Sequence, residues 1–394
     1  MLPFFHAQLA VLIRGSYYLR AMNHNNDQAA SKPAVLLLAD GTRFEGSSIG
    51  AVGVTSGEIA FNTGMYGYQE IFTDPSYMGQ VLVMATPHIG NYGIHHKEQE
   101  SKGSKIAGLV VKSFTKKGSR VGSNGELQAM LERDGVVGIS GVDTRGLIQH
   151  IREQGAMNAL ICSDGTAQDV LEQKLAAVPS MEGMELSSSV TGEIATVHGP
   201  EDGLRVALLD LGTKTNIAQC LTKRGARVKV FPMHSTLEEM QAFSPQGWLV
   251  SNGPGDPSAM PATQQLIGEI IELGQPVFGI CLGHQLIALS QNLTTSKMFN
   301  GHRGVNHPVK DLVTGRCEVT SQNHGFVVSS EEVAGRDDIE QTHVHLNDGT
   351  LAGIRLKDRP VFSVQFHPEA SAGPHDSRHL FDQFIQSIRT AEKA

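Results

Sequence analysis

The chain is poor in cysteine, and its few cysteines stand far apart. Four occur among its 394 residues, and no two have the C-x-x-C spacing that zinc ribbons and dithiol redox sites use. Small secreted domains that depend on disulfides carry many more cysteines in a shorter chain. The sequence therefore excludes a zinc ribbon, argues against a disulfide scaffold and favours a reducing, cytoplasmic setting. The four residues are Cys162, Cys220, Cys281 and Cys317.

An excess of positive charge and long apolar runs are also missing. Lysine and arginine number 32 against 40 acidic residues, which gives a net charge of −8 and an isoelectric point near 6.1. Proteins that bind nucleic acid through phosphate contacts are usually basic, so we predict no nucleic-acid partner. The apolar run at residues 9–13 is too short to span a bilayer, so we predict no membrane association.

Three common signatures of cofactor and metal sites are absent as well. The sequence has no G-x-x-x-x-G-K-[ST] phosphate loop, no G-x-G-x-x-G turn and no H-E-x-x-H helix. The 17 histidines, among them the adjacent pair His95 and His96, show no metal-ligand spacing. We therefore expect scattered, solvated histidines, and we predict neither a metal site nor a cofactor site in this chain.

The first thirty residues differ in composition from the rest. No acidic residue precedes Asp27, whereas Arg14 and Arg20 do. The part before the apolar run contains no lysine or arginine, which makes it a poor secretory signal. Two interpretations stay open: an organelle-type presequence, or an upstream start codon with the true start at Met22. In both, we expect residues 1–31 to be a disordered extension outside the fold.

Composition divides the remaining chain into two halves. Residues 32–185 combine short apolar runs with many glycines, prolines and aromatic residues, which indicates short strands and ordered loops with little helix. Three helices are predicted there: 126–133, one with its N-cap at Asp143 and its end at Gly155, and 168–177. Residues 186–203 are rich in small and polar residues and are predicted to be a linker.

From 204 to 394 short strands alternate with helices, which is typical of βαβ units. We predict an α/β protein, with a separate mixed α/β N-terminal domain followed by an open, mostly parallel sheet that has helices on both faces. The predicted strands of this half are 205–211, 227–231, 248–251 and 276–280, with further strands and turns between 309 and 366.

The sharpest chemical signal is Cys281, within the segment PVFGICLGHQLIAL. A buried strand turns here into a helix, and glycines stand two residues away on either side. Gly-x-Cys-x-Gly parallels the G-x-S-x-G nucleophile elbow, and a helix N-terminus stabilises the reactive thiolate. We predict that Cys281 is a nucleophile and that the Leu282 N–H is an oxyanion donor. The alternative is a structural cysteine at a strand end.

A second motif, RPVFSVQFHPEA, supplies a base and its partner. Pro368 disfavours helix at His367, so the segment stays extended and the side chains of His367 and Glu369 project to one side. Glu369 would then orient the imidazole and leave its other nitrogen for Cys281, as in a catalytic triad. The alternative is a surface turn after a strand.

A glycine-rich loop, LVSNGPGDPS, follows another strand of the predicted sheet. Gly253 and Gly255 would let the backbone approach a substrate closely, and their N–H groups are candidates for the second oxyanion donor. An ordinary strand-to-helix loop is the alternative.

Together, GICLGHQ, SNGPGDP and FHPEA resemble the motifs of class I glutamine amidotransferases, from about residue 205 to the C-terminus. The resemblance implies an open α/β sheet with a Cys–His–Glu triad that releases ammonia from glutamine through a cysteine thioester. Further motifs narrow the resemblance to the small-subunit family of carbamoyl-phosphate synthases, over about residues 35–388. They are FNTGMYGYQEIFTDPSY, TPHIGN, GVDTRGL, GHRGVNHPVKD, QNHGF and HPEASAGPHD.

The resemblance assigns roles to individual residues. The triad would be Cys281, His367 and Glu369, with Leu282 and Gly253 as oxyanion donors. The contacts to L-glutamine would be Ser76, Gly253, Gly255, Leu282, Gln285, Asn323, Gly325 and Phe326. The departures from the family motifs, at Gly64, Tyr66 and Phe366, touch no triad residue.

The resemblance also implies partners. The chain would hydrolyse L-glutamine to glutamate and ammonia without a cofactor of its own. A separate large subunit would use ATP, Mg²⁺ and bicarbonate to make carbamoyl phosphate for arginine and pyrimidine biosynthesis in the cytoplasm. Residues 32–185 would dock that subunit.

Three alternatives stay open. An amidotransferase chain of another synthase, such as anthranilate synthase, would be about one domain long, so the N-terminal half argues against it. A catalytically inactive regulatory subunit would have lost part of the triad, which is complete here. A cysteine hydrolase without a partner would not account for SNGPGDP and QNHGF together.

Overall fold

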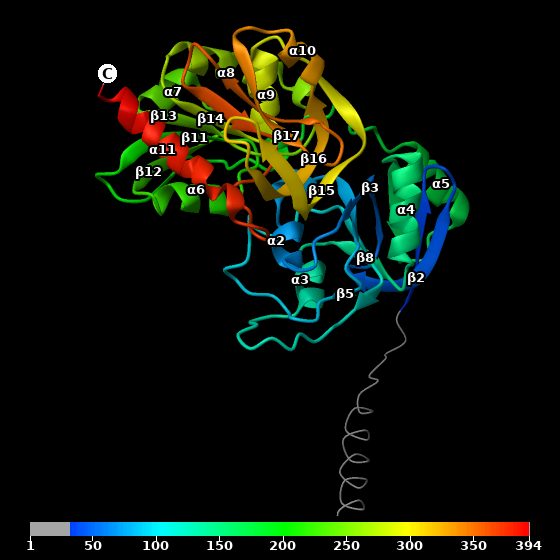
Figure 1. The fold of residues 1–394 in the computed structure, drawn as a ribbon. Helices are drawn as coiled ribbons and strands as arrows, with labels where there is room; N and C mark the ends of the chain where they lie inside the picture. The colour runs from blue at the N-terminus through cyan, green and yellow to red at the C-terminus, as the bar shows by residue number, and fades with distance from the viewer. Residues whose placement is uncertain (1–31, 394) are drawn as a thin grey trace, which may run out of the picture. The chain divides into compact units, whose positions relative to one another are not determined.

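The computed structural model describes residues 32–393, and all elements named below belong to one compact unit. The predictions made for residues 1–31 lie outside the described residues. The first half is built on a closed barrel (Figure 1). Its strands follow one another around the barrel in the order β1 (Pro33–Leu38), β2 (Arg43–Gly50), β8 (Val137–Ser140), β6 (Gly108–Val111), β4 (Gln80–Met84), β3 (Val54–Asn62) and β9 (Asn158–Cys162).

Short helices pack against this barrel. The longest is α4 (Thr144–Gln154), where the Asp143 side chain accepts a hydrogen bond from the Gly146 N–H and Gly155 ends the helix with φ 90°. Both signals therefore act as the sequence predicts. The other elements of this half are α2 (Tyr68–Phe72), α3 (Leu127–Arg133), α5 (Gln168–Ala176), the 3₁₀ turn η1 (Pro75–Tyr77) and the paired strands β5 (His88–Ile89) and β7 (Ser113–Phe114).

The second half is a ten-stranded sheet. Its strand order is β10 (Thr196–His198), β12 (Ala226–Pro232), β11 (Leu204–Asp210), β13 (Gly247–Val250), β14 (Val277–Ile280), β19 (Val361–Val364), β18 (Leu351–Leu356), β17 (Ile339–His345), β15 (Thr295–Asp311) and β16 (Cys317–Val328). The five strands from β12 to β19 are parallel, and the other pairs are antiparallel. The carboxyl ends of the parallel strands therefore meet at one edge, where sites form in such sheets.

Helices cover both faces of this sheet (Figure 1). The helices α7 (Leu237–Gln241), α8 (Pro261–Glu272), α9 (Leu282–Ser290) and α10 (Ser330–Ala334) contribute to one apolar core. The helices α6 (Thr215–Thr222) and α11 (His379–Ala391) contribute to the other. In that second core Phe278 stacks on Phe362 at 4.5 Å and meets Phe381 edge-on at 5.7 Å. Burial of each such ring stabilises the fold by about 1.5–3 kcal/mol.

The predicted fold class is confirmed, and the predicted alternation of strands and helices is present. Two features differ from the sequence expectation. β10, inside the segment predicted to be a linker, is an edge strand of the sheet whose three residues are exposed, so no apolar pattern marked it. β15 begins at Thr295, whereas the sequence analysis predicted strands in this region only from residue 309. Polar and apolar residues alternate irregularly along the first part of β15, so the sequence pattern did not indicate a strand there. Among the described residues, no helix has the length and apolar character needed to cross a membrane.

Candidate active site

The backbone bends sharply where β14 meets α9. Cys281 lies between them with φ 53° and ψ −103°, a conformation that a non-glycine residue rarely adopts and that is typical of strained functional turns. The neighbouring glycines make room for it. A Cβ on Gly283 would stand 2.3 Å from the carbonyl oxygen of Val250, and one on Gly279 would stand 2.5 Å from the side chain of Ile287. The predicted elbow therefore has a steric reason for both glycines.

The three predicted triad residues are buried side by side. His367 Nδ1 and Glu369 Oε1 are 2.8 Å apart, and both side chains are fully buried, while Cys281 is 3% exposed. The Cys281 thiol donates toward the carbonyl oxygen of Asn323 at 3.5 Å, and Gln365 Nε2 lies 3.7 Å from the sulfur. His367 Nε2 has no hydrogen-bond partner within the described part of the chain, so it is available to a bound substrate or to the thiol.

Electrostatics favour an ionised Glu369 and a protonated His367. Burial and the Lys214 cation lower the pKa of His367. The carboxylate of Glu369 and the Cys281 sulfur have the larger, opposite effect and raise this pKa to about 10. Burial raises the pKa of Glu369, but Lys214 and His367 bring it down to about 2. At neutral pH the pair is therefore an imidazolium beside a carboxylate, with the imidazolium close to the sulfur.

Sequence reasoning missed Lys214, which lies after β11 and is 3% exposed. Its ammonium group is 2.7 Å from Glu369 Oε1 and 3.9 Å from Asp74 Oδ2. Burial lowers the pKa of Lys214, but Glu369, Asp74 and Glu100 together raise it. Glu100, also buried, has a pKa of about 7 because burial raises it more than Lys214 lowers it. A single lysine in the segment LGTK gave no signal that would have predicted this contact.

The two predicted oxyanion donors are neighbours. Leu282 is the first residue of α9, so its N–H has no partner within the helix. Gly253 lies against it, because a Cβ on Gly253 would stand 2.7 Å from the Leu282 side chain and 2.1 Å from the carbonyl oxygen of Leu211. Gly255 packs elsewhere: a Cβ there would meet the carbonyl oxygen of Met184 at 2.6 Å. The geometry therefore fits Gly253 better than Gly255 as the second donor.

Ser76, predicted to contact glutamine from the first half, lies beside Asn252, the residue before the predicted oxyanion donor Gly253. Asn252 Nδ2 donates to Ser76 Oγ at 2.9 Å. Asp74 accepts hydrogen bonds from the Ser76 N–H at 2.9 Å and from Asn323 Nδ2 at 3.2 Å. Asp74 thus joins two of the predicted glutamine contacts, one from each half of the chain.

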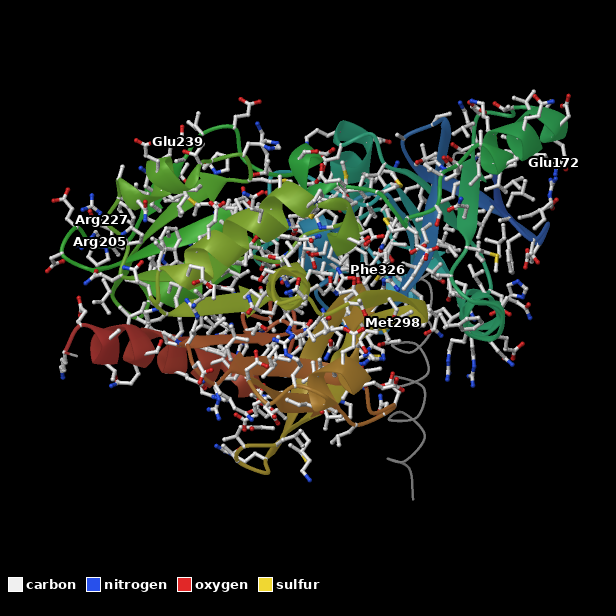
Figure 2. All side chains as sticks on the ribbon, turned by 90° about the horizontal axis from the view of Figure 1, so that it is seen from above. Glu172, Arg205, Arg227, Glu239, Met298 and Phe326 are labelled. Carbon is white, nitrogen blue, oxygen red and sulfur yellow. The ribbon has the colours of Figure 1, made fainter. Side chains whose placement is uncertain are left out.

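The other predicted contacts lie along β16 and α9. Gln285 Nε2 donates to the carbonyl oxygen of Phe326 at 2.8 Å and to Gln365 Oε1 at 3.0 Å. A Cβ on Gly325 would meet the guanidinium group of Arg303 at 3.3 Å. In Figure 2, Phe326 lies at the opposite end of the second-half sheet from Arg205, which is near the amino end of β11. The contact of the Cys281 sulfur with the Asn323 carbonyl oxygen places Asn323 beside the predicted nucleophile.

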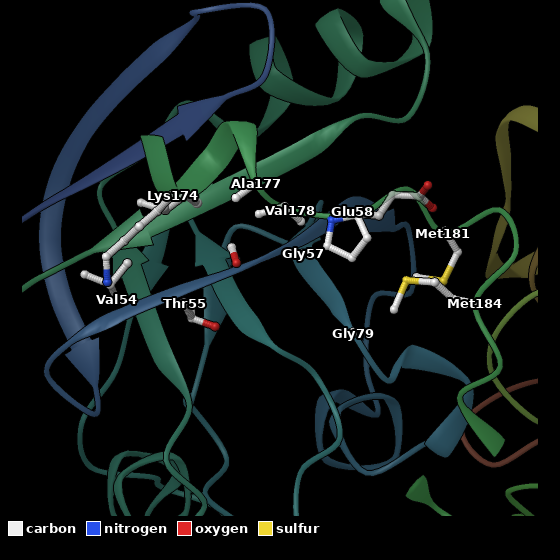
Figure 3. A pocket seen from close by; sticks show the side chains of 13 residues that line it. Val54, Thr55, Gly57, Glu58, Gly79, Lys174, Ala177, Val178, Met181 and Met184 are labelled. Carbon is white, nitrogen blue, oxygen red and sulfur yellow. The ribbon is translucent and has the colours of Figure 1, made fainter. Parts of the chain in front are cut away.

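Figure 3 shows a cavity of about 630 Å³. It is lined by residues of the first half and of the following segment, among them Glu58, Lys174, Met181 and Met184. No triad residue lines it. Because the reactive groups are all elsewhere, we do not assign glutamine to this cavity.

The expectation of scattered, solvated histidines is wrong. His284, His324, His343 and His345 are buried, with at most 6% exposure. His345 also stacks on His302 with ring centroids 4.0 Å apart. The histidines are separated in sequence by strands that the fold brings together, so local spacing gave no sign of the cluster.

The fold and this site define a class of protein. An open α/β sheet with a Cys–His–Glu set at the carboxyl edge of its parallel strands is the architecture of class I glutamine amidotransferases. The protein-family model described as "Glutamine amidotransferase class-I" matches residues 207–387.

The first half narrows the class to one family. The model described as "Carbamoyl-phosphate synthase small chain, CPSase domain" matches residues 36–161. The carbamoyl phosphate synthase small chain of Polynucleobacter necessarius is 44% identical over 92% of this chain and 97% of its own length. Those of Thermotoga maritima and a Synechococcus strain are 42% and 40% identical, over 91% and 96% of this chain and 99% and 98% of their own lengths. The chain belongs to the family of carbamoyl-phosphate synthase small chains.

Proposed function

We propose that the chain hydrolyses L-glutamine to glutamate and ammonia and passes the ammonia to a large subunit. That subunit would use ATP, Mg²⁺ and bicarbonate to make carbamoyl phosphate for arginine and pyrimidine biosynthesis in the cytoplasm. The observation that carries the proposal is the elbow cysteine at φ 53° next to the buried His367–Glu369 pair. An exposed or unpartnered cysteine would not support it.

The chemistry divides into two steps. The Cys281 thiolate attacks the carboxamide carbon of glutamine, and the developing oxyanion is held by the N–H groups of Leu282 and Gly253. One such donor is typically worth ~10²–10³ in rate. The C–N bond breaks, and ammonia leaves with a proton from His367, whose pKa of about 10 keeps it protonated at neutral pH.

Hydrolysis of the thioester completes the cycle. His367, now neutral, takes a proton from water, whose oxygen attacks the acyl carbon; the C–S bond breaks and glutamate is released. Glu369 orients the imidazole and stabilises its charged form. Lys214, 2.7 Å from Glu369, keeps that carboxylate ionised and is a positioning residue.

Binding of glutamine would involve both halves. Ser76 and Asn323, joined through Asp74, offer polar atoms for the α-amino and α-carboxylate groups. Gly255, Gln285, Gly325 and Phe326 would complete the pocket. We further propose that residues 32–185 dock the large subunit, that 186–203 join the two domains and that 204–394 form the amidotransferase domain.

The proposal is tested with Cys281→Ser in a complex reconstituted with the large subunit. We expect loss of glutamine-dependent carbamoyl phosphate synthesis and retention of ammonia-dependent synthesis, because a serine hydroxyl is a far weaker nucleophile than a thiolate at neutral pH. Cys162→Ser, which changes a buried cysteine on β9 of the barrel, is the matched control. Near-normal glutaminase turnover by Cys281→Ser would show that the nucleophile lies elsewhere.

A further inference from the structure

Two histidines and an aspartate converge on the side of the sheet formed by β15 and β17. His302 lies on β15, His345 ends β17, and Asp348 lies in the turn before β18. Asp348 Oδ2 is 2.7 Å from His302 Nε2, and Asp348 Oδ1 is 3.1 Å from His345 Nδ1. One ligand atom from each of the three side chains lies within 4.8 Å of the other two.

Neighbouring hydrogen bonds determine which His345 nitrogen carries the proton. His345 Nε2 lies 3.0 Å from His307 Nδ1, so one of these two nitrogens donates a hydrogen bond to the other. The Asn347 N–H donates to His345 Nδ1 at 3.3 Å, which requires a lone pair on that nitrogen and leaves Nε2 as the donor to His307. The proton of a neutral His345 is therefore on Nε2.

This tautomer leaves two acceptors facing each other. With the proton on Nε2, the lone pair of His345 Nδ1 faces a carboxylate oxygen of Asp348 at a distance of 3.1 Å. Such a contact is unfavourable unless a cation lies between the two atoms. His302 places its Nε2 next to the other oxygen of the same carboxylate and so offers a third ligand atom. Its Nδ1 is buried without a hydrogen-bond partner among residues 32–393.

The distances suit a small transition-metal ion. Tetrahedral zinc with bonds of ~2.0–2.2 Å separates its ligand atoms by about 3.3 Å, so the pairs at 2.7 and 3.1 Å need to open only slightly. Asp348 is 38% exposed, which leaves access for the ion and for a water ligand.

We propose that His302, His345 and Asp348 bind one divalent transition-metal ion of the Zn²⁺ class, with water completing the coordination. Two imidazoles and one carboxylate favour Zn²⁺, Co²⁺ or Ni²⁺ over Mg²⁺ and Ca²⁺, which prefer oxygen ligands. When the ion binds, the Nε2 proton of neutral His302 moves to Nδ1. His307 positions His345 by accepting from its Nε2, as partners of metal-bound histidines commonly do.

The ion would act as a clip between two segments that are distant in the sequence and adjacent in the sheet. It would tie β15 to the turn after β17, 43 residues further along by the numbering of His302 and His345. His302 also contacts His324 edge-on at 5.0 Å, and His324 follows the candidate glutamine contact Asn323. None of the three proposed ligands belongs to the triad, so the proposal stands apart from the proposed function.

The test is metal titration of the full chain without an affinity tag. We expect saturable binding of one Co²⁺ per chain, with the visible absorption of tetrahedral Co²⁺, its displacement by Zn²⁺ and a higher melting temperature with Zn²⁺. His345→Ala and Asp348→Asn should each weaken binding at least tenfold. His307→Phe should weaken it by ~10–100-fold, the usual effect of removing a partner of a metal ligand.

A matched control is His150→Ala. His150 also contacts an aspartate, Asp40, but in the described part of the chain it belongs to no group of three side chains that could bind a metal ion. It should bind Co²⁺ as the wild type does. Absence of saturable binding by the wild type would overturn the proposal, as would wild-type affinity in both His345→Ala and Asp348→Asn. If His345→Ala fails to fold by circular dichroism, Asp348→Asn, which lies in an exposed turn, decides alone.

Discussion

Replacement of Lys214 by methionine tests the buried charges most directly. Methionine keeps the length of the apolar stem but removes the cation 2.7 Å from Glu369. At an effective dielectric constant of 20, the attraction between charges at this distance is about 6 kcal/mol. Part of it is offset by the cost of burying the ammonium group, and loss of one partner from a buried pair typically costs about 3–5 kcal/mol. We expect a loss of that size in the free energy of unfolding.

The variant should also change the pH dependence of activity. Lys214 is the strongest influence that lowers the pKa of Glu369 against the effect of burial. Without it, the pKa of Glu369 rises above about 2, so Glu369 becomes neutral at a higher pH and the acidic limb of the pH–rate profile moves toward neutrality. Urea unfolding followed by circular dichroism and glutaminase assays between pH 4 and 9 measure the two effects.

A surface lysine provides the control. Lys357 is exposed, so Lys357→Met should change the free energy of unfolding by no more than about 0.5 kcal/mol. If Lys214→Met lost less than about 1 kcal/mol and kept the wild-type pH profile, the view that Lys214 holds the Glu369 carboxylate in its ionised form would be refuted.

Four further predictions concern the same site. Glu369→Gln should lower kcat by ~10²–10⁴-fold and His367→Ala by more, as single-turnover assays would measure; equal loss in both would contradict the division of roles. Because the folded-state pKa of Glu369, about 2, is below its usual 4.5, its stabilising contribution is present above pH 4.5 and lost as the pH falls toward 2, so Glu369→Gln should flatten the acid limb of stability measured by urea unfolding. Ser76→Ala should raise the KM for glutamine by about 2–10-fold with kcat retained, and an unchanged KM would remove Ser76 from the pocket. Gly283→Ala should destabilise the protein by about 1–3 kcal/mol or more, since its Cβ would stand 2.3 Å from a carbonyl oxygen; a melting temperature equal to that of the wild type would contradict this.

Local chemistry accounts for the parts that sequence reasoning predicted well. The elbow depends on residues two positions from Cys281, so its requirement for Gly279 and Gly283 is visible in a five-residue window. The end signals of α4 are equally local, because Asp143 bonds an N–H three residues away and Gly155 adopts the positive φ that ends the helix. Regular alternation of strand and helix then implies a parallel sheet and a site at its carboxyl edge.

What the sequence did not predict depends on contacts between distant residues. Lys214 and Glu369 are 155 positions apart by their numbers, and their pairing arises only because β11 and β19 end at the same edge of the sheet. The histidine cluster has the same origin, since β15 pairs with β17 across residues that carry no common motif. β10 was missed for another reason: three exposed residues at a sheet edge bury too little apolar surface to leave a pattern.

The buried polar groups between the two halves constrain both. Asp74 accepts from Asn323, Ser76 accepts from Asn252, and Lys214 approaches Asp74 within 3.9 Å. Buried polar groups are costly unless they are paired, so separation of the halves would leave these side chains either unpaired or exposed to water. The first half therefore contributes to the geometry of the triad even though it contains none of its residues: it supplies a carboxylate beside the lysine that keeps Glu369 ionised. A change in the first half that moved Asp74 would reach Glu369 through a single intervening side chain.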